Sequence, residues 1–273
     1  MTTEAVVDPE APAVAHIEAR SDGVLAGGPV ASLAFRELDP AAEITWHVVD
    51  GGVFARGTRL ADINAKARAV LSAERVALNF LQLLSGVATQ TRAFVRAVEG
   101  TGVTILDTRK TTPGLRLLEK FAVLAGGAKN HRYGLFDQIL IKENHLRAAG
   151  SLTEAVRRAR AIQSGLPLVV EARTEEEAVE AAALAVDRIL LDNFTPPRLE
   201  RCLKRLGAGK RGATGAAVVP AIEVSGGLKL SNVREFALPG VSFLSVGALT
   251  RSAPAVDLSL LVDAVGAEVA KGA

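Results

Sequence analysis

The chain has 273 residues, of which 49% are hydrophobic and 23% charged, so it is long enough for one large domain or two ordinary ones and is neither disordered, collagen-like nor a coiled coil. Lysine and arginine (32) nearly balance aspartate and glutamate (30), and the net charge of +2 argues against a general nucleic-acid or membrane surface. The single cysteine, Cys202, excludes an internal disulfide and, with only four histidines, a cysteine-rich zinc site.

These features and the start of the chain predict a cytoplasmic protein. The first ten residues lack the basic and apolar regions of a signal peptide. No apolar run approaches the roughly 18 residues that are needed to cross a bilayer. We therefore expect neither secretion nor membrane insertion.

The first part of the chain predicts irregular β structure followed by one long helix. Short apolar or alternating runs at 15–20, 23–25 and 45–49 are separated by glycine, proline and aspartate. A helix is predicted over 72–98, because apolar residues recur there at helical spacing and Gly100 follows. These apolar residues are Val76, Phe80, Leu83, Leu84, Val87, Phe94 and Val98. The end of this helix is the expected domain boundary.

Beyond residue 102 the sequence predicts short, almost continuously apolar strands that alternate with helices. The strands cover 103–107, 138–142, 168–171, 188–192, 218–224 and 241–245. Three helix starts are marked, by capping-box spacing at 151–154 and 174–177 and by Thr195 before Pro196. Strands that are apolar on both faces and joined by helices predict a parallel sheet, either doubly wound or closed into a barrel.

Polar residues at the strand ends favour the barrel. Each strand ends in or beside one of them: Asp107, Lys142, Glu171, Asp192, Ser225 and Ser245. In an open doubly wound sheet only the strands at the switch point need functional carboxyl ends, whereas in a barrel all of these ends meet at one mouth. Any one such residue is more simply explained as facing a loop, but together they indicate a shared site.

Cations gather at this predicted mouth. Arg109 and Lys110 directly follow a strand, and Pro113 is expected to begin the next helix. A glycine-rich loop then adds His131 and Arg132, and Lys142 ends the following strand. Arginine pairs with carboxylates through two parallel hydrogen bonds and lysine acts as a point charge, so the cluster suits a small polyanion. His145 is interpreted as structural.

Two carboxylates and two glycine-containing turns complete the candidate site. Glu171 and Asp192 end successive strands and can hold Mg²⁺ and sugar hydroxyls, stabilise positive charge at a carbon atom, or pair with the basic cluster. The last two strands end in 225–227 (Ser-Gly-Gly) and in Ser245 and Gly247. Loops after the last strands of α/β barrels often bind phosphate, so these turns predict a phosphate site.

A glycine pattern at 207–212 matches a dinucleotide fingerprint but is rejected. It follows a predicted helix over 196–206 and precedes a strand, whereas the fingerprint must follow a strand and open a helix. No P-loop, His-Glu-x-x-His or Gly-x-Ser-x-Gly motif is found.

Four runs, 74–82, 107–116, 129–132 and 140–145, resemble the quinolinate phosphoribosyltransferases, also known as carboxylating nicotinate-nucleotide pyrophosphorylases. The similarity extends from about residue 14 to the end of the chain. It implies an N-terminal α/β sandwich domain over 1–99, completed by 252–273, and an incomplete (open) α/β barrel of TIM-like type over 100–251. It also implies dimers or multiples of them, and a reaction of quinolinate with phosphoribosyl pyrophosphate and Mg²⁺ that forms nicotinate mononucleotide, CO₂ and pyrophosphate in NAD biosynthesis.

The resemblance also implies a role for each residue of the site. Lys110, Glu171 and Asp192 would be catalytic, and the two carboxylates would face the ribose and its magnesium. The residues expected to bind the substrates are Arg75, Thr108, Arg109, His131, Arg132, Lys142, Ser225, Gly226, Gly227, Ser245 and Gly247. Arg75 would enter the site of the neighbouring subunit.

The chain departs from the pattern of this family at two places. The chain begins near the point where an additional helix and acidic segment of the family would end, and Val169 replaces a common glutamate.

Rival enzymes are a relative acting on another pyridine acid such as nicotinate, the molybdenum-transport-associated paralogue, and a Schiff-base aldolase using Lys110 or Lys142. The rival outside the enzyme class is a catalytically weak protein that binds phosphorylated metabolites.

Overall fold

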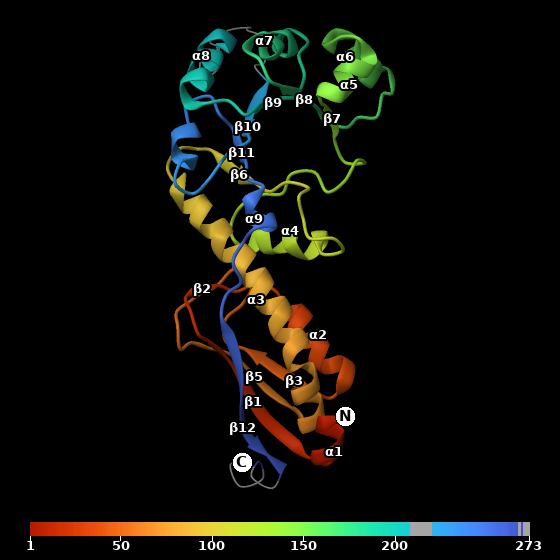
Figure 1. The fold of residues 1–273 in the computed structure, drawn as a ribbon, viewed down its shortest axis with the longest axis vertical. Helices are drawn as coiled ribbons and strands as arrows, with labels where there is room; N and C mark the ends of the chain where they lie inside the picture. Colours follow the sequence, from red (N-terminus) through yellow and green to blue (C-terminus); the bar gives the residue numbers. More distant parts are fainter. Residues whose placement is uncertain (208–219, 267–268, 270–273) are drawn as a thin grey trace. The chain divides into compact units, whose positions relative to one another are not determined.

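The computed structural model describes residues 1–207, 220–266 and 269 (Figure 1). The chain forms two compact units. The first contains Met1–Arg92, Thr112–Gly127 and the chain from Ser252 onward, and the second contains Ala93–Thr111 and Ala128–Arg251. The segment Thr112–Gly127, which the sequence placed in the second domain, therefore belongs to the first unit. In the part of the chain that the structure describes, no helix is long and apolar enough to span a membrane.

The first unit is built on an antiparallel sheet with the strand order β12-β1-β5-β3. The strands are β1 (Pro12–Ala19), β3 (Glu43–Trp46), β5 (Arg59–Lys66) and β12 (Leu258–Val265). Alternate residues of β1, such as Ala15 and Ile17, are fully buried, while Glu18 on the opposite face pairs with Arg20. This alternation is typical of a sheet with one buried face. The C-terminal strand thus completes the N-terminal sheet.

Helices α2 (Gly28–Leu38) and α3 (Ala67–Ala97) pack on the buried face of this sheet, so the unit is an α/β sandwich. The sequence prediction missed α2, because it assigned irregular β structure with glycine and proline breaks to this part of the chain. Pro29 instead occupies the first turn of the helix, where its missing N–H costs no hydrogen bond. The smaller elements of the unit are α1 (Thr2–Val6), β2 (Gly23–Val24), β4 (Val53–Phe54) and α4 (Arg116–Ala125).

The long helix starts earlier than predicted, and four of its seven predicted apolar residues are buried: Leu84, Val87, Phe94 and Val98. α3 begins at Ala67 and not at residue 72, and Val76 is 51% exposed while Phe80 is half-buried. Toward the start of the helix, the buried residues are instead Val70, Ala73, Ala77 and Leu81. Alanines allow the helix to approach the sheet closely, and a search for large apolar residues does not find them.

The second unit contains a parallel sheet with the strand order β6-β11-β10-β9-β8-β7. The strands are β6 (Thr104–Leu106), β7 (Ile139–Ile141), β8 (Leu168–Ala172), β9 (Arg188–Asp192), β10 (Ala221–Ser225) and β11 (Phe243–Ser245). This is the cyclic order of a barrel, with β6 and β7 left unjoined among the described strands. Lys129 forms a bridge to Leu106 on the free side of β6. The sheet is therefore an open barrel, as expected.

The helices of this unit that lie between these strands are α5 (Glu143–Ala149), α6 (Leu152–Ala161), α7 (Glu175–Ala183), α8 (Pro196–Leu206) and the 3₁₀ helix η1 (Val233–Phe236), and α9 (Ala248–Arg251) follows the last of the strands. Figure 1 shows α5 to α8 side by side beyond the strands, and α5, α6, α7 and α8 contact one another in sequence. Two of the three predicted caps are confirmed, because Ser151 Oγ accepts from Glu154 N at 3.1 Å and Thr174 Oγ1 accepts from Glu177 N at 3.0 Å. Thr195 precedes α8 as predicted, but its side chain forms no cap hydrogen bond.

Two details near the strand ends differ from the prediction. The helix expected at Pro113 begins at Arg116, because Gly114 has a φ of +79°, which is outside the helical region. The strand predicted over 218–224 is observed from Ala221, and residues 218 and 219 lie outside the described part of the chain. Gly207 of the rejected glycine pattern ends α8 with a φ of +64°, and the rest of that pattern also lies outside the described residues.

Candidate active site

The register of the parallel sheet places the polar strand-end residues on one face. Neighbouring residues in a parallel pair share a face, and residues two apart along a strand share it as well. Glu171 lies opposite Leu190, and Asp192 lies opposite Ser225, which in turn lies opposite Ser245. Five of the six predicted positions, from Lys142 to Ser245, therefore share one face near the carboxyl ends of their strands.

Lys142 and Glu171 form an ion pair and a hydrogen bond at this face. Leu140 is paired with Val169 in the sheet. Lys142 and Glu171 lie two positions beyond these residues on the same face, so their side chains are neighbours. The Glu171 side chain is only 6% exposed, whereas that of Lys142 is 42% exposed. The ammonium group can therefore reach a ligand, and the carboxylate is held in place. Of the uses left open by the sequence, pairing with the basic cluster is the one observed for Glu171.

Asp192 ends the next strand two residues beyond the level of Glu171. One of its carboxylate oxygens, Oδ2, accepts a hydrogen bond of 2.8 Å from Asn193 Nδ2. Asn193 has a φ of +57°, and its backbone N–H donates to Ser225 O at 2.9 Å. The left-handed turn after β9 thus joins this carboxylate to the Ser-Gly-Gly turn after β10.

Arg109 and Arg132 form the positive part of the site. Arg132 is 9% exposed, and its Nη1 donates to Gln138 O at 3.1 Å. Burial lowers the pKa of Arg132, and the positive charge of Arg109 lowers it further, while Asp137 opposes the shift. Arg132 Nε is buried and has no hydrogen-bond partner among the described residues. Two arginines whose charges interact, one of them with an unused donor, are suited to bind an anion with more than one negative charge.

Glu223, which the sequence prediction did not single out, is a fully buried carboxylate at the centre of the sheet. Its Oε2 accepts from Arg188 Nη1 at 3.0 Å, and its Oε1 accepts from Ser245 Oγ and lies 3.3 Å from His131 Nε2. Burial acts to raise the pKa of Glu223, but the hydrogen bonds from His131, Ser245 and Arg188 outweigh it and lower the pKa. The signal in the sequence was a charged residue inside an otherwise apolar strand.

The turn after β10 has the backbone of the predicted phosphate site. Gly226 and Gly227 have φ values of +96° and +66°, which other residues adopt only with strain. A Cβ atom on Gly226 would lie 2.2 Å from Asn193 Oδ1, so the turn also leaves no space for a side chain. Ser225 is half-buried at the start of this turn. Such turns direct backbone N–H groups outward and are suited to bind a phosphate.

The predicted residues at β6 and β11 also lie close together. A Cβ atom on Gly247 would be 3.4 Å from Lys110 Cδ and 3.5 Å from Thr108 Oγ1. Lys110 N donates to Thr108 Oγ1 at 3.1 Å, and Lys110 O accepts from Thr250 Oγ1 at 2.8 Å. The Lys110 backbone is therefore fixed between the turns that follow the two strands. The hydroxyl of Ser245, in contrast, is used internally by Glu223.

Arg75 and His145 are held by contacts close to them in the chain. Arg75 lies on α3 in the first unit, its side chain is 81% exposed, and Nη2 is 3.6 Å from Glu74. His145 Nδ1 accepts from the backbone N–H of Lys142 at 2.9 Å, and thus acts at the start of α5. This contact agrees with the structural role expected for His145.

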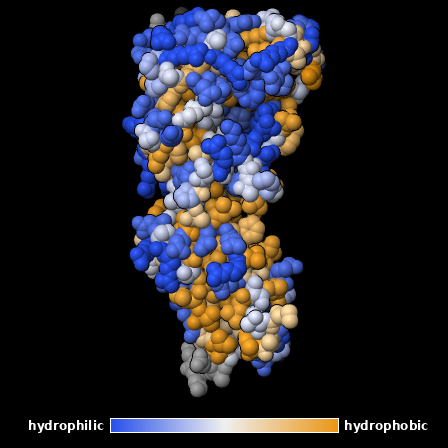
Figure 2. Space-filling view, in the orientation of Figure 1, coloured by the Kyte–Doolittle hydropathy of each residue, from blue (hydrophilic) through white to orange (hydrophobic). Residues whose placement is uncertain are grey.

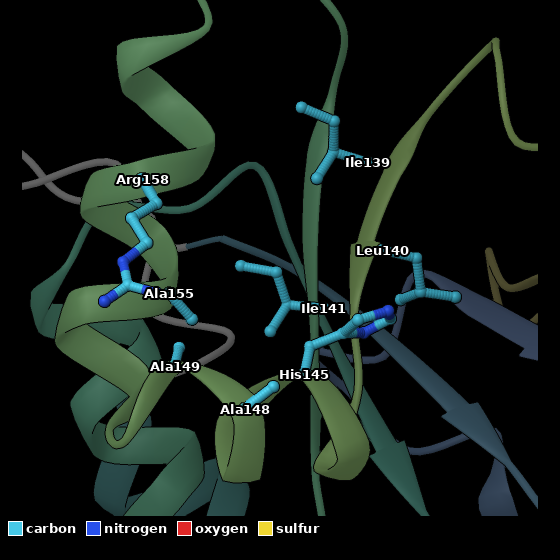
Figure 3. Close-up of a pocket in the computed structure, with 8 residues that line it drawn as sticks. All are labelled: Ile139, Leu140, Ile141, His145, Ala148, Ala149, Ala155 and Arg158. Carbon is cyan, nitrogen blue, oxygen red and sulfur yellow. The ribbon is translucent and has the colours of Figure 1, made fainter.

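A separate cavity of about 290 Å³ lies beside β7 (Figure 3). It is lined by Ile139, Leu140, Ile141, His145, Ala148, Ala149, Ala155 and Arg158. Figure 3 shows Arg158 of α6 across the cavity from the His145 ring. Arg158 is already paired with Glu154 at 2.6 Å, and the other lining residues are mostly apolar. This cavity does not suit a polyanion, and the candidate site is the polar face of the sheet.

The described residues hold no group of three or more histidine, cysteine, aspartate or glutamate side chains that could bind a metal ion. Glu171 and Asp192 offer hard oxygen ligands from neighbouring strands. Mg²⁺ is commonly bound by one or two carboxylates together with phosphate oxygens of a substrate. The residues therefore fit a magnesium ion that arrives with a phosphorylated substrate.

Comparisons with known proteins cover nearly the whole chain. The quinolinate phosphoribosyl transferase N-terminal domain family matches residues 1–85, and the corresponding C-terminal domain family matches residues 87–261. The similarity thus begins before residue 14, where the sequence analysis placed its start. The chain is 41% identical over 247 residues to the probable carboxylating nicotinate-nucleotide pyrophosphorylase of Bacillus subtilis, covering 90% of this chain and 82% of the relative.

Similar proteins from other sources agree with this match. The carboxylating nicotinate-nucleotide pyrophosphorylase of Homo sapiens is 40% identical over 259 residues, which cover 94% of this chain and 84% of the human protein. The solved structure of the nicotinate-nucleotide pyrophosphorylase from Francisella tularensis superposes with a TM-score of 0.89 at 36% identity, covering 96% of this chain and 90% of that chain.

Proposed function

The chain belongs to the quinolinate phosphoribosyltransferase family, and on that premise we propose that it joins quinolinate to phosphoribosyl pyrophosphate, releasing pyrophosphate and CO₂ and forming nicotinate mononucleotide for NAD biosynthesis. The observation that carries the proposal is the placement of Lys142, Glu171 and Asp192 on one face of the parallel sheet. A cation for an acidic substrate and two carboxylates for an activated sugar are thereby held side by side.

Quinolinate carries two carboxylates on adjacent ring positions. We assign these to Arg109, Arg132 and Lys142, whose charges gather in the second unit. The buried donor on Arg132 Nε is free to bind a carboxylate oxygen. Charge-assisted hydrogen bonds of this kind are about twice as strong as neutral ones. Binding the dianion also relieves the repulsion between the two arginines.

The phosphoribosyl group is assigned to the other half of the face. The turns at 225–227 and at Gly247 would hold its 5′-phosphate through backbone N–H groups, with Thr108 beside them. Lys110 would lie between the base and the sugar. As pyrophosphate leaves, positive charge develops on the ribose carbon, and the carboxylates of Glu171 and Asp192 stabilise it.

Magnesium would be held by Asp192 and Glu171 together with oxygens of the diphosphate, and it would neutralise the charge of the departing pyrophosphate. The residues of the chain bind and orient the two reactants. Once the ring nitrogen of quinolinate carries the ribose, its positive charge stabilises the electron pair that stays on the adjacent ring carbon when the carboxylate leaves as CO₂, and that carbon then takes up a proton from water. No basic side chain is needed for this second step.

We also propose that the protein acts as a homodimer or a higher homo-oligomer and that Arg75 completes the site of a neighbouring subunit. The Arg75 guanidinium is largely exposed in one copy of the chain. The first unit exposes further apolar side chains, among them Leu33, Leu38, Val76, Leu117 and Phe121. Figure 2 shows apolar residues gathered on the visible face of this unit. Contiguous exposed apolar surface is typical of an interaction site.

An assay of pyrophosphate release tests this function directly. With phosphoribosyl pyrophosphate and Mg²⁺, we expect quinolinate to support release and nicotinate, which lacks the second carboxylate, to support little. Omission of Mg²⁺ should abolish most of the activity. Equal turnover of nicotinate would show that the chain acts on another pyridine acid. Binding of both substrates without release of pyrophosphate would identify a binding protein, and a borohydride-trapped adduct would indicate Schiff-base chemistry.

A further inference from the structure

The carboxylate of Glu223 is fully buried next to a site that must attract a dianion. A buried negative charge at that place weakens anion binding unless it is neutralised and hydrogen-bonded. Three elements supply the necessary donors: Arg188 on β9, Ser245 on β11 and His131 in the loop before β7. Arg188 is itself fixed with its guanidinium carbon 4.1 Å from the centre of the Phe243 ring. These contacts hold both the Glu223 carboxylate and the Arg188 guanidinium in place.

His131 connects Glu223 to the substrate-binding cluster. The backbone N–H of His131 donates to Asp107 Oδ1 at 2.6 Å, which fixes its main chain. In the ring, Nδ1 accepts from the backbone N–H of Arg132 at 2.7 Å, and Nε2 lies 3.3 Å from Glu223 Oε1. A nitrogen that accepts a hydrogen bond carries no proton, so this network assigns the proton to Nε2. The ring is then neutral, and both of its nitrogens are bonded within the protein.

The residue that follows in the chain is Arg132. Its backbone N–H is held by the His131 ring, and its Nη1 is held by Gln138 O. With these two contacts made, Nε stays buried without a partner among the described residues. The His131 ring thus holds the main chain from which the Arg132 side chain extends, and Glu223 lies at the opposite side of that ring.

We propose that Glu223 is a positioning residue: acting through a neutral His131, it fixes the Arg132 backbone so that the guanidinium faces a substrate carboxylate, and neither Glu223 nor His131 touches the substrate. The inference rests on the proposed function and deepens it. It also gives His131 a different role from the direct substrate contact that the family resemblance implies.

The first experiment compares Glu223→Gln with Glu200→Gln by calorimetric titration of quinolinate and of phosphoribosyl pyrophosphate. Glutamine keeps the shape of the side chain but offers one acceptor oxygen where three donors converge, so at least one bond is lost. We expect the Kd for quinolinate to rise about tenfold or more and the Kd for phosphoribosyl pyrophosphate to stay within about twofold. Glu200 is an exposed residue of α8 paired with Lys204, and its variant should behave as wild type.

A double-mutant cycle distinguishes positioning from direct contact or general damage. If Glu223 acts through Arg132, the Glu223→Gln change should have no further effect on quinolinate affinity once Arg132→Ala has removed the guanidinium. Additive losses would overturn the proposal. If Glu223→Gln folds poorly, Ser245→Ala removes one donor to Glu223 with little change in volume, and a smaller loss confined to quinolinate is expected.

A spectroscopic test examines the tautomer itself. The chain has four histidines, so ¹⁵N-histidine labelling gives few signals, and His131→Gln identifies the one of interest. We expect an unprotonated Nδ1 and a protonated Nε2, with or without quinolinate, and a changed signal in Glu223→Gln. Protonation of both nitrogens on addition of quinolinate would overturn the proposal. If wild type and Glu223→Gln bind quinolinate equally well, this inference alone is refuted. If wild type does not bind quinolinate, the proposed function is refuted as well.

Discussion

At the level of single residues, the site is organised by charges that are shared between neighbouring strands. Glu171 is held by Lys142 on one side, and its Oε1 lies 3.9 Å from Arg173 Nε on the other. Glu223 is held by three donors. Each carboxylate is thus fixed before a substrate arrives, which reduces the loss of side-chain freedom on binding.

Removing a cation from the site should weaken binding of quinolinate specifically. We expect Arg132→Ala and Lys142→Ala each to cost about 1.5 to 3 kcal/mol in quinolinate binding, because a charge-assisted hydrogen bond is lost. Titration calorimetry with each substrate provides the measurement, and Lys204→Ala on the exposed face of α8 serves as the control. Loss of affinity for phosphoribosyl pyrophosphate, with quinolinate unaffected, would contradict the assignment.

Cys202 should be unreactive in the folded protein and should make stability depend on pH. Burial, with a smaller contribution from the charge of Glu175, raises the pKa of this thiol from 9.0 to about 11. Between pH 9 and 11 the unfolded thiol loses its proton while the folded one keeps it, so the free energy of unfolding falls as the pH rises. Denaturant titrations at pH 8 and pH 10 should show a larger decrease in wild type than in Cys202→Ala. Equal decreases would contradict this prediction, as would rapid alkylation of the native protein at pH 8.

At the level of elements, the turns that follow the strands determine which groups reach the face of the sheet. The turn after β10 depends on Gly226, since both its positive φ and its closeness to Asn193 exclude a side chain. The start of α7 depends on Thr174, whose Oγ1 accepts from the backbone N–H of Glu177. In return, the Glu177 carboxylate accepts from the backbone N–H groups of Arg173 and Thr174.

Gly226→Ala should impair binding of phosphoribosyl pyrophosphate. Its Cβ atom would lie 2.2 Å from Asn193 Oδ1, so the turn must move and its N–H groups must change direction. We expect a loss of about tenfold or more in affinity for phosphoribosyl pyrophosphate with little change for quinolinate. Gly150→Ala provides a matched control, because Gly150 also has a positive φ but nothing lies within 4 Å of its Cβ position. Normal binding by Gly226→Ala would show that this turn is not the phosphate site.

At the level of the whole molecule, the first unit supplies Arg75 and the second supplies the face that carries Lys142. If Arg75 completes the site of a neighbouring subunit, the two residues of one working site come from different chains. The dimer would then be required for catalysis and not only for stability.

Mixing two inactive variants tests this arrangement. Arg75→Ala and Lys142→Ala should each be nearly inactive alone, but in a mixed dimer one of the two sites receives both intact residues. An equal mixture, unfolded and refolded together, should regain about one quarter of the wild-type activity, as half of the dimers are mixed and each has one intact site. Pyrophosphate release measures the recovery, and size-exclusion chromatography checks that dimers have formed. Absence of recovery would place Arg75 in the site of its own chain or in no site.

The sequence by itself determined the parallel sheet and most of the positions that line its polar face. Short strands with an apolar centre, such as Arg188–Asp192, form wherever both faces of a sheet are covered, and cap residues such as Thr174 mark helix starts through local hydrogen bonds. Because side chains alternate and parallel strands end at one edge, Lys142, Glu171 and Asp192 could be brought together without coordinates.

Only the tertiary structure decided which residues near the start of α3 are buried, that residues 112–127 join the first unit, and that Glu223 is the centre of a buried hydrogen-bond network. These features depend on partners that are far away in the chain. Ser245 is 22 positions from Glu223 and Arg188 is 35 positions from it. A local pattern records the propensity of a segment but not the distant donor that makes a buried charge tolerable, and so the decisive contacts could be identified only in the folded molecule.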